Sequence, residues 1–353
     1  MKQAGAAIRR PVGRTATAYG LAALAGWGAS RLHIPLPWMI GPLLVTAGLS
    51  IAGIMDHPLP VRTRPFGQAV VATTVGLAFT DRALAVVLGM LPLLVGLTAI
   101  TTIFALAVSV VQARLAGVQL SRMVLATFPV APVEAAVIAE SRGLPVAPVI
   151  LAQSLRIAAI VVLIPTLLYA IDGFSRPDRA GATASQVFDD PMLVALPLIG
   201  LAGGYMFRRL GWANPWFLGP LSLAAGLTAV GIELPRYPPF VLAGAQVILG
   251  AWLGSTFQAD LLRAARRELA ISVLGTLGFL MLACGSAAAL ARLTPLDWRL
   301  LVLGIAPGGV TEMALTARFL HQDMSVVTAA HVVRIFLLMP LARPLIRWIQ
   351  RFD

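Results

Sequence analysis

The chain has 353 residues, of which 58% are apolar and only 12% are charged, and its mean hydropathy is +0.86. Soluble globular proteins carry about 25% charged residues, so this composition excludes an ordinary soluble domain and predicts a polytopic membrane protein. The net charge of +12 comes almost entirely from arginines at the ends of apolar segments; because no basic patch or soluble module accompanies them, they indicate membrane topology rather than direct contact with nucleic acid.

The N-terminus carries four basic residues, from Lys2 to Arg14, in front of the first apolar segment. A secretory signal begins in the same way. The apolar segment that follows corresponds, however, to 193–207 in the second half of the chain, so we expect it to be retained as the first span. Because cytoplasmic segments are enriched in basic residues, the N-terminus is predicted to be cytoplasmic.

Twelve apolar segments follow along the chain, each long enough to span, or nearly span, a hydrocarbon core of about 30 Å. In the first half they occupy about 15–32, 36–55, 67–80, 84–113, 122–140 and 146–170. In the second half they occupy about 192–208, 215–232, 241–257, 269–293, 300–317 and 326–349. The segment 67–80 is the shortest in the first half, which suits a re-entrant structure. Whether it crosses decides between parallel and inverted repeats, and both remain open.

The second half repeats the first at an offset of 178 residues. The motif Pro-Trp-x-x-Gly-Pro occurs at 37–42 and again at 215–220, and Gln68 corresponds to Gln246. A single offset over most of both halves indicates an internal duplication. We therefore predict an all-α polytopic membrane protein of about 10–12 transmembrane or re-entrant helices. Its predicted parts are a first membrane repeat at 15–170, a polar linker at 171–191 and a second membrane repeat at 192–349.

Helix-breaking residues lie at matching positions of the two repeats: Pro129 and Pro132 in the first, and Pro307, Gly308 and Gly309 in the second. Proline removes a backbone hydrogen bond and clashes with the preceding turn, and glycine leaves a gap in the packing. In lipid such a break persists only where protein or a water-filled cavity satisfies the freed backbone groups. Broken helices at the repeat interface point to a transporter's central site. A simple proline kink with close helix packing is the alternative.

Each break is followed by a glutamate and, 22 residues after it, by an arginine: Glu134 with Arg156, and Glu312 with Arg334. A charged side chain at the centre of a bilayer costs roughly 2.5–3.5 kcal/mol, so these four must pair or line water. One interpretation is that glutamates and arginines compensate each other as a structural lock. The other is that the arginines bind an anionic group or that the glutamates exchange protons. The polar neighbours expected in such a site are Gln68, Gln246, Thr127, Thr311 and His331.

No pattern in the sequence is typical of a catalytic or metal centre. The four histidines lack metal-ligand spacing, the single cysteine, Cys284, lies in an apolar run, and there is no glycine-rich phosphate loop. We therefore expect no enzymatic activity, no cofactor and no metal. The expected partners are the lipid bilayer and a small solute, with a homo-oligomer left open and no direct nucleic acid.

The duplicated Pro-Trp-x-x-Gly-Pro motif, the stretch 307–313 and His331-x-x-Arg334 resemble the bacterial AbrB membrane-protein family, and the resemblance covers roughly 20–350. It implies a multi-pass inner-membrane protein with a twice-occurring membrane domain. Members are described as regulators of gene expression and, in older labels, as ammonia monooxygenases. The first repeat has Val130-Ala131 in place of the glycine pair, so a site role implied by the family applies more directly to the second repeat.

The function predicted from these features is that of a secondary transporter or permease for a small solute, for which an anion is one option, with its site between the repeats. The alternatives are a membrane-embedded regulator that acts indirectly on gene expression and, third, an oxidoreductase. A transporter needs a polar cavity, a regulator needs a partner-binding surface, and a copper enzyme needs clustered histidines.

Overall fold

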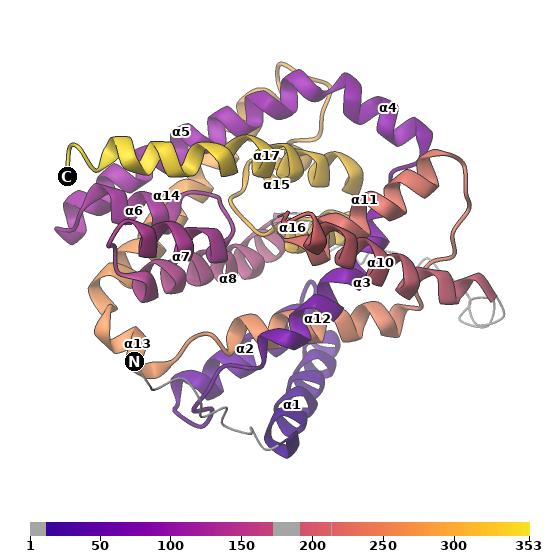
Figure 1. The fold of residues 1–353 in the computed structure, drawn as a ribbon, viewed down its shortest axis with the longest axis horizontal. Coiled ribbons are helices and arrows are strands. Elements are labelled where there is room, and N and C mark those ends of the chain that lie inside the picture. The colour runs from indigo at the N-terminus through magenta and orange to yellow at the C-terminus, as the bar shows by residue number, and fades with distance from the viewer. Residues whose placement is uncertain (1–11, 172–190, 213) are drawn as a thin grey trace.

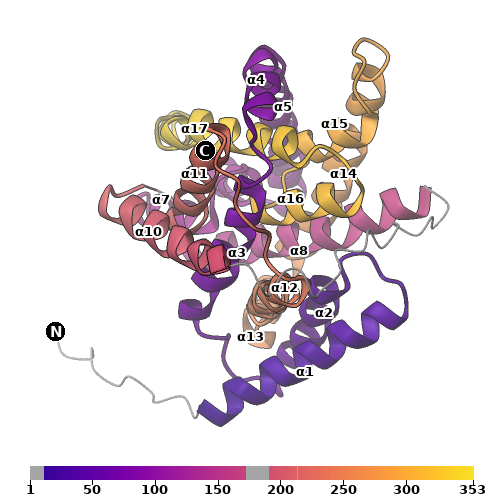
Figure 2. The same cartoon turned by 90° about the vertical axis from the view of Figure 1, so that its right-hand side faces the viewer.

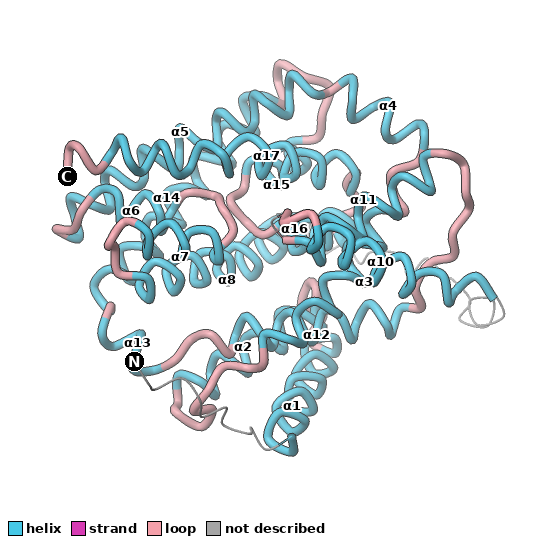
Figure 3. Tube along the Cα trace, viewed as in Figure 1, coloured by secondary structure: helices cyan, strands magenta, loops and turns pink. Residues whose placement is uncertain are grey.

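The computed structural model describes residues 12–171, 191–212 and 214–353 (Figure 1). This part of the chain contains helices and loops but no strand, as Figure 3 shows. Within it, four helices are long and apolar enough to cross a membrane: α5 (Leu91–Ala116), α8 (Val146–Ile171), α14 (Arg266–Leu290) and α17 (Met324–Ile349). The predicted all-α multi-pass membrane protein is therefore confirmed. The predicted polar linker lies outside the described residues over 172–190.

The helices of the second half repeat those of the first in the same order. The first half also contains α1 (Val12–Arg31), α2 (Pro37–Ile51), α3 (Arg64–Gly76), α4 (Asp81–Gly89), α6 (Leu120–Thr127) and α7 (Pro132–Ser141). The second half also contains α10 (Ala195–Arg209), α11 (Pro215–Ala229), α12 (Pro239–Gly254), α13 (Ala259–Ala264), α15 (Trp298–Ile305) and α16 (Val310–Phe319). The starts of α6, α7 and α8 are each 178 residues before those of α15, α16 and α17, so the offset in the sequence also separates equivalent helices.

Six helices form one part of the molecule, which we call the Pro-Trp bundle: α1, α2, α3, α10, α11 and α12. Its packing exchanges helices between the repeats, because α2 packs against α12 as well as α1, and α11 packs against α3 as well as α10. In Figure 2, α1, α2 and α12 lie together at the bottom of the view. Neither repeat therefore forms an independent body.

Glycines allow the helices of the Pro-Trp bundle to cross closely. A Cβ atom added to Gly41 would lie 2.5 Å from the carbonyl oxygen of Ala25, and one added to Gly219 would overlap the carbonyl of Gly203. Small residues at such crossings let helix backbones approach in a membrane, where burial of apolar surface gives no drive for association. The glycine of the Pro-Trp-x-x-Gly-Pro motif thus has a packing role in both repeats.

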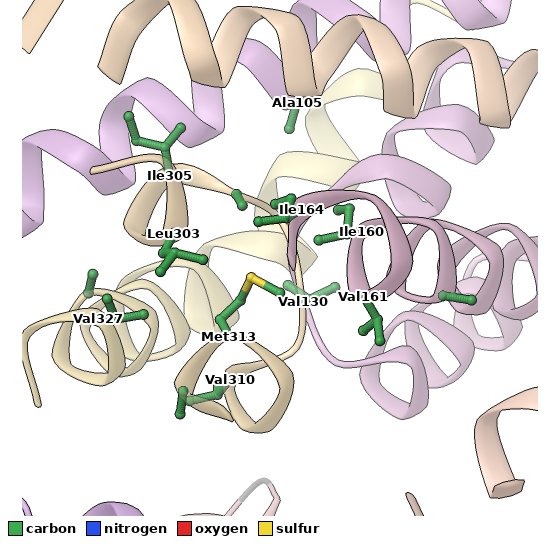
Figure 4. Close-up of a cluster of buried hydrophobic side chains, with 14 of the residues drawn as sticks. Ala105, Val130, Ile160, Val161, Ile164, Leu303, Ile305, Val310, Met313 and Val327 are labelled. Atoms are coloured by element: carbon green, nitrogen blue, oxygen red, sulfur yellow. The ribbon is translucent and has the colours of Figure 1, made fainter. Parts of the chain in front are cut away.

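Helices α5 to α8 and α14 to α17 form the broken-helix bundle, which extends from the upper left to the centre of Figure 1. Its core is apolar and draws on both repeats. Figure 4 shows Val130 and Ile160 from the first repeat beside Leu303, Val310 and Met313 from the second. Because these side chains surround the two points where a helix is interrupted, packing holds the short helices together in the interior.

The predicted segments 122–140 and 300–317 are each broken into two short helices. The backbone is extended at Phe128 and Ala131 between α6 and α7, and at Ala306 and Gly309 between α15 and α16. A helix of eight to ten residues is only about 12–15 Å long, so neither half spans the bilayer by itself. The predicted Pro/Gly-broken helices are confirmed.

A sharp bend lies near the end of the segment predicted at 67–80. Helix α3 ends at Gly76, and α4 leaves it at an angle of 89° after a short turn. Together the two helices are long and apolar enough to cross a membrane. The described residues therefore contain a fifth crossing if α3 and α4 count as one bent span. The structure accordingly places a break in this segment.

Candidate functional site

A cavity of about 110 Å³ lies between the Pro-Trp bundle and the broken-helix bundle. From the Pro-Trp bundle it is lined by Arg64, Gln68, Asn214, Leu249, Trp252 and Leu253. From the broken-helix bundle it is lined by residues at both breaks, 129–132 and 308–312, and by Ser154, Arg156, Ile157, Arg334, Ile335 and Met339. Two elements far apart in the sequence, the breaks of the two repeats, therefore meet at one cavity.

Each of the two embedded arginines caps the end of a short helix. The Nη1 atom of Arg156 donates to the carbonyl oxygens of Ala126 at 3.3 Å and Phe128 at 3.4 Å, and also to Thr127, at the end of α6. In the second repeat, Arg334 donates to Ala306 at 2.9 Å and Gly308 at 3.2 Å, beyond the end of α15. The last carbonyls of a helix have no partner within it and carry partial negative charge, which a cation offsets.

A second pair of equivalent residues supports these caps. Gln153 donates from Nε2 to the carbonyl oxygen of Leu125 at 2.6 Å, and His331 Nε2 lies 2.8 Å from the carbonyl oxygen of Leu303. Because Nδ1 of His331 accepts from Arg334, Nε2 carries the proton and the ring is neutral. His331 is fully buried and does not line the cavity, so it positions Arg334 from behind.

The suggested pairing of each glutamate with its arginine is not formed. In the described ranges no ion pair joins Glu134 or Glu312 to either arginine. The reason is directional: each glutamate is in the first turn after a break, whereas each arginine reaches the helix that ends before it. An acidic residue in a first turn is stabilised by the positive end of the helix dipole. The regular sequence spacing therefore does not correspond to direct pairing in the described residues, which was one of the two interpretations of that spacing.

The cation that faces Glu312 is Arg64 of α3, and the two interact electrostatically across the cavity. The guanidinium of Arg64 also lies over the ring of Trp252, 4.5 Å from its centroid. Both residues line the cavity from the Pro-Trp bundle, while Glu312 lines it from the broken-helix bundle. Opposite charges on the two bundles therefore meet at their interface.

Arg156 and Arg334 have no carboxylate of this kind. They are only 5% and 3% exposed, and each places a positive charge close enough to repel the other. Within the part of the chain that the structure describes, the Nε atoms of both are buried without a hydrogen-bond partner. Among these same residues, Nη1 is the terminal nitrogen of Arg156 that donates to a protein group. Two like charges with unused donors at one cavity make it suited to an anion.

Most of the predicted central-site residues lie at this cavity. Gln68, Thr311, Glu312, Arg156 and Arg334 line it, together with Pro129, Pro132, Gly308 and Gly309 of the breaks. Three others do not: Glu134 is half-buried on α7, Gln246 is buried within the Pro-Trp bundle and His331 lies behind Arg334. Pro307 is buried beside the second break, and Thr127 donates to Gln112 Oε1 at 2.6 Å, behind α6.

The sequence interpretation missed Arg64, Asn214, Trp252 and Ser154. Asn214 has a positive φ of 49° and accepts a hydrogen bond of 3.2 Å from Nε2 of Gln68. A signal was present in the repeat itself, because the equivalents of Arg64 and Asn214 are the apolar Leu242 and Leu36. Polar residues that occur in only one of two matching positions mark where the repeats have diverged.

The described residues contain no group of three or more histidine, cysteine, aspartate or glutamate side chains placed to hold a metal ion. The cavity itself offers one carboxylate, Glu312, among arginines and amides. Its chemistry is therefore that of hydrogen-bond donation and positive charge.

Known proteins resemble this chain along nearly its full length. A protein of Bacillus subtilis (strain 168) named "Uncharacterized protein YhjN" is 26% identical and the match covers 93% of this chain and 91% of that protein. A protein of Escherichia coli (strain K12) named "Putative regulator AbrB" is 22% identical, over 94% of this chain and 95% of that protein. The profile of one family, described as "Transition state regulatory protein AbrB", matches twice, at 2–172 and 59–350. The chain therefore belongs to the AbrB family, as its motifs predicted.

Proposed function

We propose that this protein is a secondary transporter of a small anionic solute, and that the cavity between the two bundles is its binding site. The observation that carries the proposal is the presence of Arg156 and Arg334, one from each repeat, as buried cations at a single cavity beside two broken helices. Broken helices at matching positions of two repeats are the usual place for a transporter's substrate.

Helix capping alone is a weak explanation for two buried charges. Gln153 satisfies the carbonyl of Leu125 with an uncharged amide in the same bundle, so a neutral side chain can do this work here. Desolvating a guanidinium costs several kcal/mol, and the repulsion between Arg156 and Arg334 adds to that cost. A bound anion would offset both terms, which gives the charges a purpose that capping does not.

The arrangement of the two bundles also suits alternating access. Most packing lies within each bundle, and the two are joined around the cavity mainly where α3 meets α16 and α17, and where α2 and α12 meet α8. Movement of one bundle against the other would open the cavity first to one side and then to the other. The charges of Arg64 and Glu312 lie on opposite sides of this interface and would separate or rejoin during the movement.

Transport can be tested with purified protein reconstituted in liposomes. We expect uptake of at least one radiolabelled anion from a panel of small carboxylates and inorganic anions, and at least a tenfold lower rate in Arg156→Gln and Arg334→Gln. Arg62→Gln is the matched control, because Arg62 is exposed, lies outside the cavity and carries the same charge. Uptake that is equal in all three variants would contradict the proposal.

We place the protein in the bacterial inner membrane with a cytoplasmic N-terminus, supported by the basic residues before α1. Reporter fusions after residue 10 test this orientation. Reporter activity on the periplasmic side would reverse it.

A regulatory role is the second candidate, supported by the family's description and by the name of the Escherichia coli relative. The two candidates make different demands on the same variant. If regulation follows from transport, a folded but transport-inactive Arg334→Gln protein should reproduce the transcript changes of a deletion strain. If it follows from a partner-binding surface, that variant should restore normal transcripts.

A further inference from the structure

The cavity combines charged and apolar lining residues. Its charged and amide side chains come mainly from α3, the start of α11, α8, α16 and α17, whereas α12 contributes Leu249 and Leu253 and packs against α8, which adds Ile157. On α17, Ile335 follows Arg334 directly and Met339 lies one turn further on. An inorganic anion, which keeps a hydration shell on all sides, has no use for such an apolar wall.

The charges leave room for about one negative charge. Arg64 is offset by Glu312, so the uncompensated cations are Arg156 and Arg334. The C-terminal ends of α6 and α15, which they cap, together supply about one negative charge. The positive ends of α7 and α16 together supply about one positive charge, which Glu134 in the first turn of α7 offsets. The remaining charge is close to +1, which matches a monoanion.

The size of the cavity limits the ligand further. An engineered apolar cavity of about 150 Å³ binds benzene, so the cavity of about 110 Å³ holds a molecule of roughly five to six non-hydrogen atoms. This excludes nucleotides and long-chain lipids but admits a small organic acid.

Resting on the proposed function, we propose that the solute is a small organic monocarboxylate with an apolar tail. Its carboxylate lies between Arg156 and Arg334, where the free Nη2 of Arg156 is a donor, and its tail packs against Leu249, Leu253 and Ile157. The equivalents of Leu253 and Trp252 in the first repeat are Val75 and Thr74. The two repeats therefore offer different side chains to the ligand's tail, and the ligand binds with its tail toward the second-repeat residues.

Thermal unfolding of the purified protein in detergent tests this class directly, because a ligand that binds the native state raises the melting temperature. The probes are butyrate, its neutral analogue butyramide, the short-chain acetate, the dicarboxylate succinate, and sulfate. We expect butyrate to bind at least tenfold more tightly than each of the others. Butyramide isolates the charge, and acetate isolates the tail.

Two variants locate the ligand. Leu253→Asn should weaken the binding of butyrate at least fivefold while leaving that of acetate unchanged, whereas Arg156→Gln should weaken both. Leu210→Asn is the control for the first, because Leu210 is 61% exposed and outside the cavity. If Leu253→Asn does not fold, the comparison of the five probes on the unmodified protein still decides.

The outcomes separate this inference from the function on which it rests. Sulfate, succinate or acetate binding as tightly as butyrate overturns the apolar monocarboxylate while leaving an anion site in place. Butyramide binding as tightly as butyrate overturns the requirement for charge, and with it the anionic solute. If none of the four anions changes the melting temperature, both the inference and the proposed function are overturned.

Discussion

Arg156 and Arg334, at equivalent positions of the two repeats, each reach back about 28 residues to hydrogen-bond the carbonyl groups where a short helix ends. The two guanidinium groups come together at one cavity because the broken helices of the two repeats meet there. The two arginine caps are therefore also a local concentration of positive charge. The following predictions separate the capping role from the role of the charge.

Removing the cap should destabilise the protein. In Arg334→Met the carbonyls of Ala306 and Gly308 lose their donor, and each buried carbonyl left unsatisfied costs about 1–3 kcal/mol. We expect a loss of about 2–4 kcal/mol in unfolding free energy, measured by titration of the detergent-solubilised protein with sodium dodecyl sulfate. Arg62→Met, at an exposed position, should change it by no more than about 0.5 kcal/mol. Equal losses would show that Arg334 is not the cap.

The histidine behind Arg334 should be replaceable by the residue of the first repeat. His331→Gln introduces a side-chain amide at the position that is equivalent to Gln153 in the first repeat. The carbonyl of Leu303 therefore keeps a hydrogen-bond donor. We expect less than about 1 kcal/mol of destabilisation for His331→Gln and about 1–3 kcal/mol for His331→Leu. The same unfolding titration distinguishes them, and a Gln variant as unstable as the Leu variant would rule out the shared capping role.

Glutamate 312 should be coupled to Arg64 and not to Arg334. A double-mutant cycle of Glu312→Gln with Arg64→Gln should give a coupling free energy of about 1 kcal/mol or more, because opposite charges interact across the cavity. The cycle with Arg334→Met should give less than about 0.5 kcal/mol, since no ion pair joins these two within the described residues. A reversal of this order would restore the lock suggested by the sequence spacing.

Replacing glutamate by glutamine should change ligand binding at Glu312 of the second repeat but not at the equivalent Glu134 of the first. Glu312→Gln removes a negative charge at the cavity and frees Arg64, so we expect butyrate to bind about tenfold more tightly, equivalent to about 1.4 kcal/mol. Glu134→Gln is the matched control from the other repeat, because Glu134 does not line the cavity. An equal effect of both variants would mean that Glu312 acts only on its helix and not on the ligand.

Close crossing of helices in the Pro-Trp bundle should be sensitive to a single methyl group. In Gly219→Ala the new Cβ overlaps the carbonyl of Gly203, and overpacking of this kind costs about 1–3 kcal/mol. Gly226→Ala is the control, because Gly226 lies about two helix turns further along α11 and a Cβ added there meets open space. It should be neutral or slightly stabilising. Comparable melting temperatures of the two variants would contradict the crossing.

Local features of the sequence were enough to predict the helices, the duplication and the two breaks. Pro132 and the stretch 307–309 favour a break because the missing N–H and the missing side chains act within one turn. The clustering of these residues at matching positions of the two repeats was the informative signal, since single prolines such as Pro165 and Pro340 lie inside helices here. The offset of 178 residues likewise needs no structure. The family followed from the same motifs and was confirmed by the match to its profile.

The partners of the buried charges were decided only by the tertiary structure. Constant spacing suggested that Glu312 would pair with Arg334, yet the arginine is used by carbonyls at 2.9 and 3.2 Å, and the glutamate faces Arg64, 248 residues away in the chain. A guanidinium takes whichever acceptors the fold presents, and here the ends of broken helices compete with a carboxylate. Residues such as Arg64 and Asn214 enter the cavity from the other bundle, so their role depends on how the bundles pack, a long-range property that spacing along the chain does not encode.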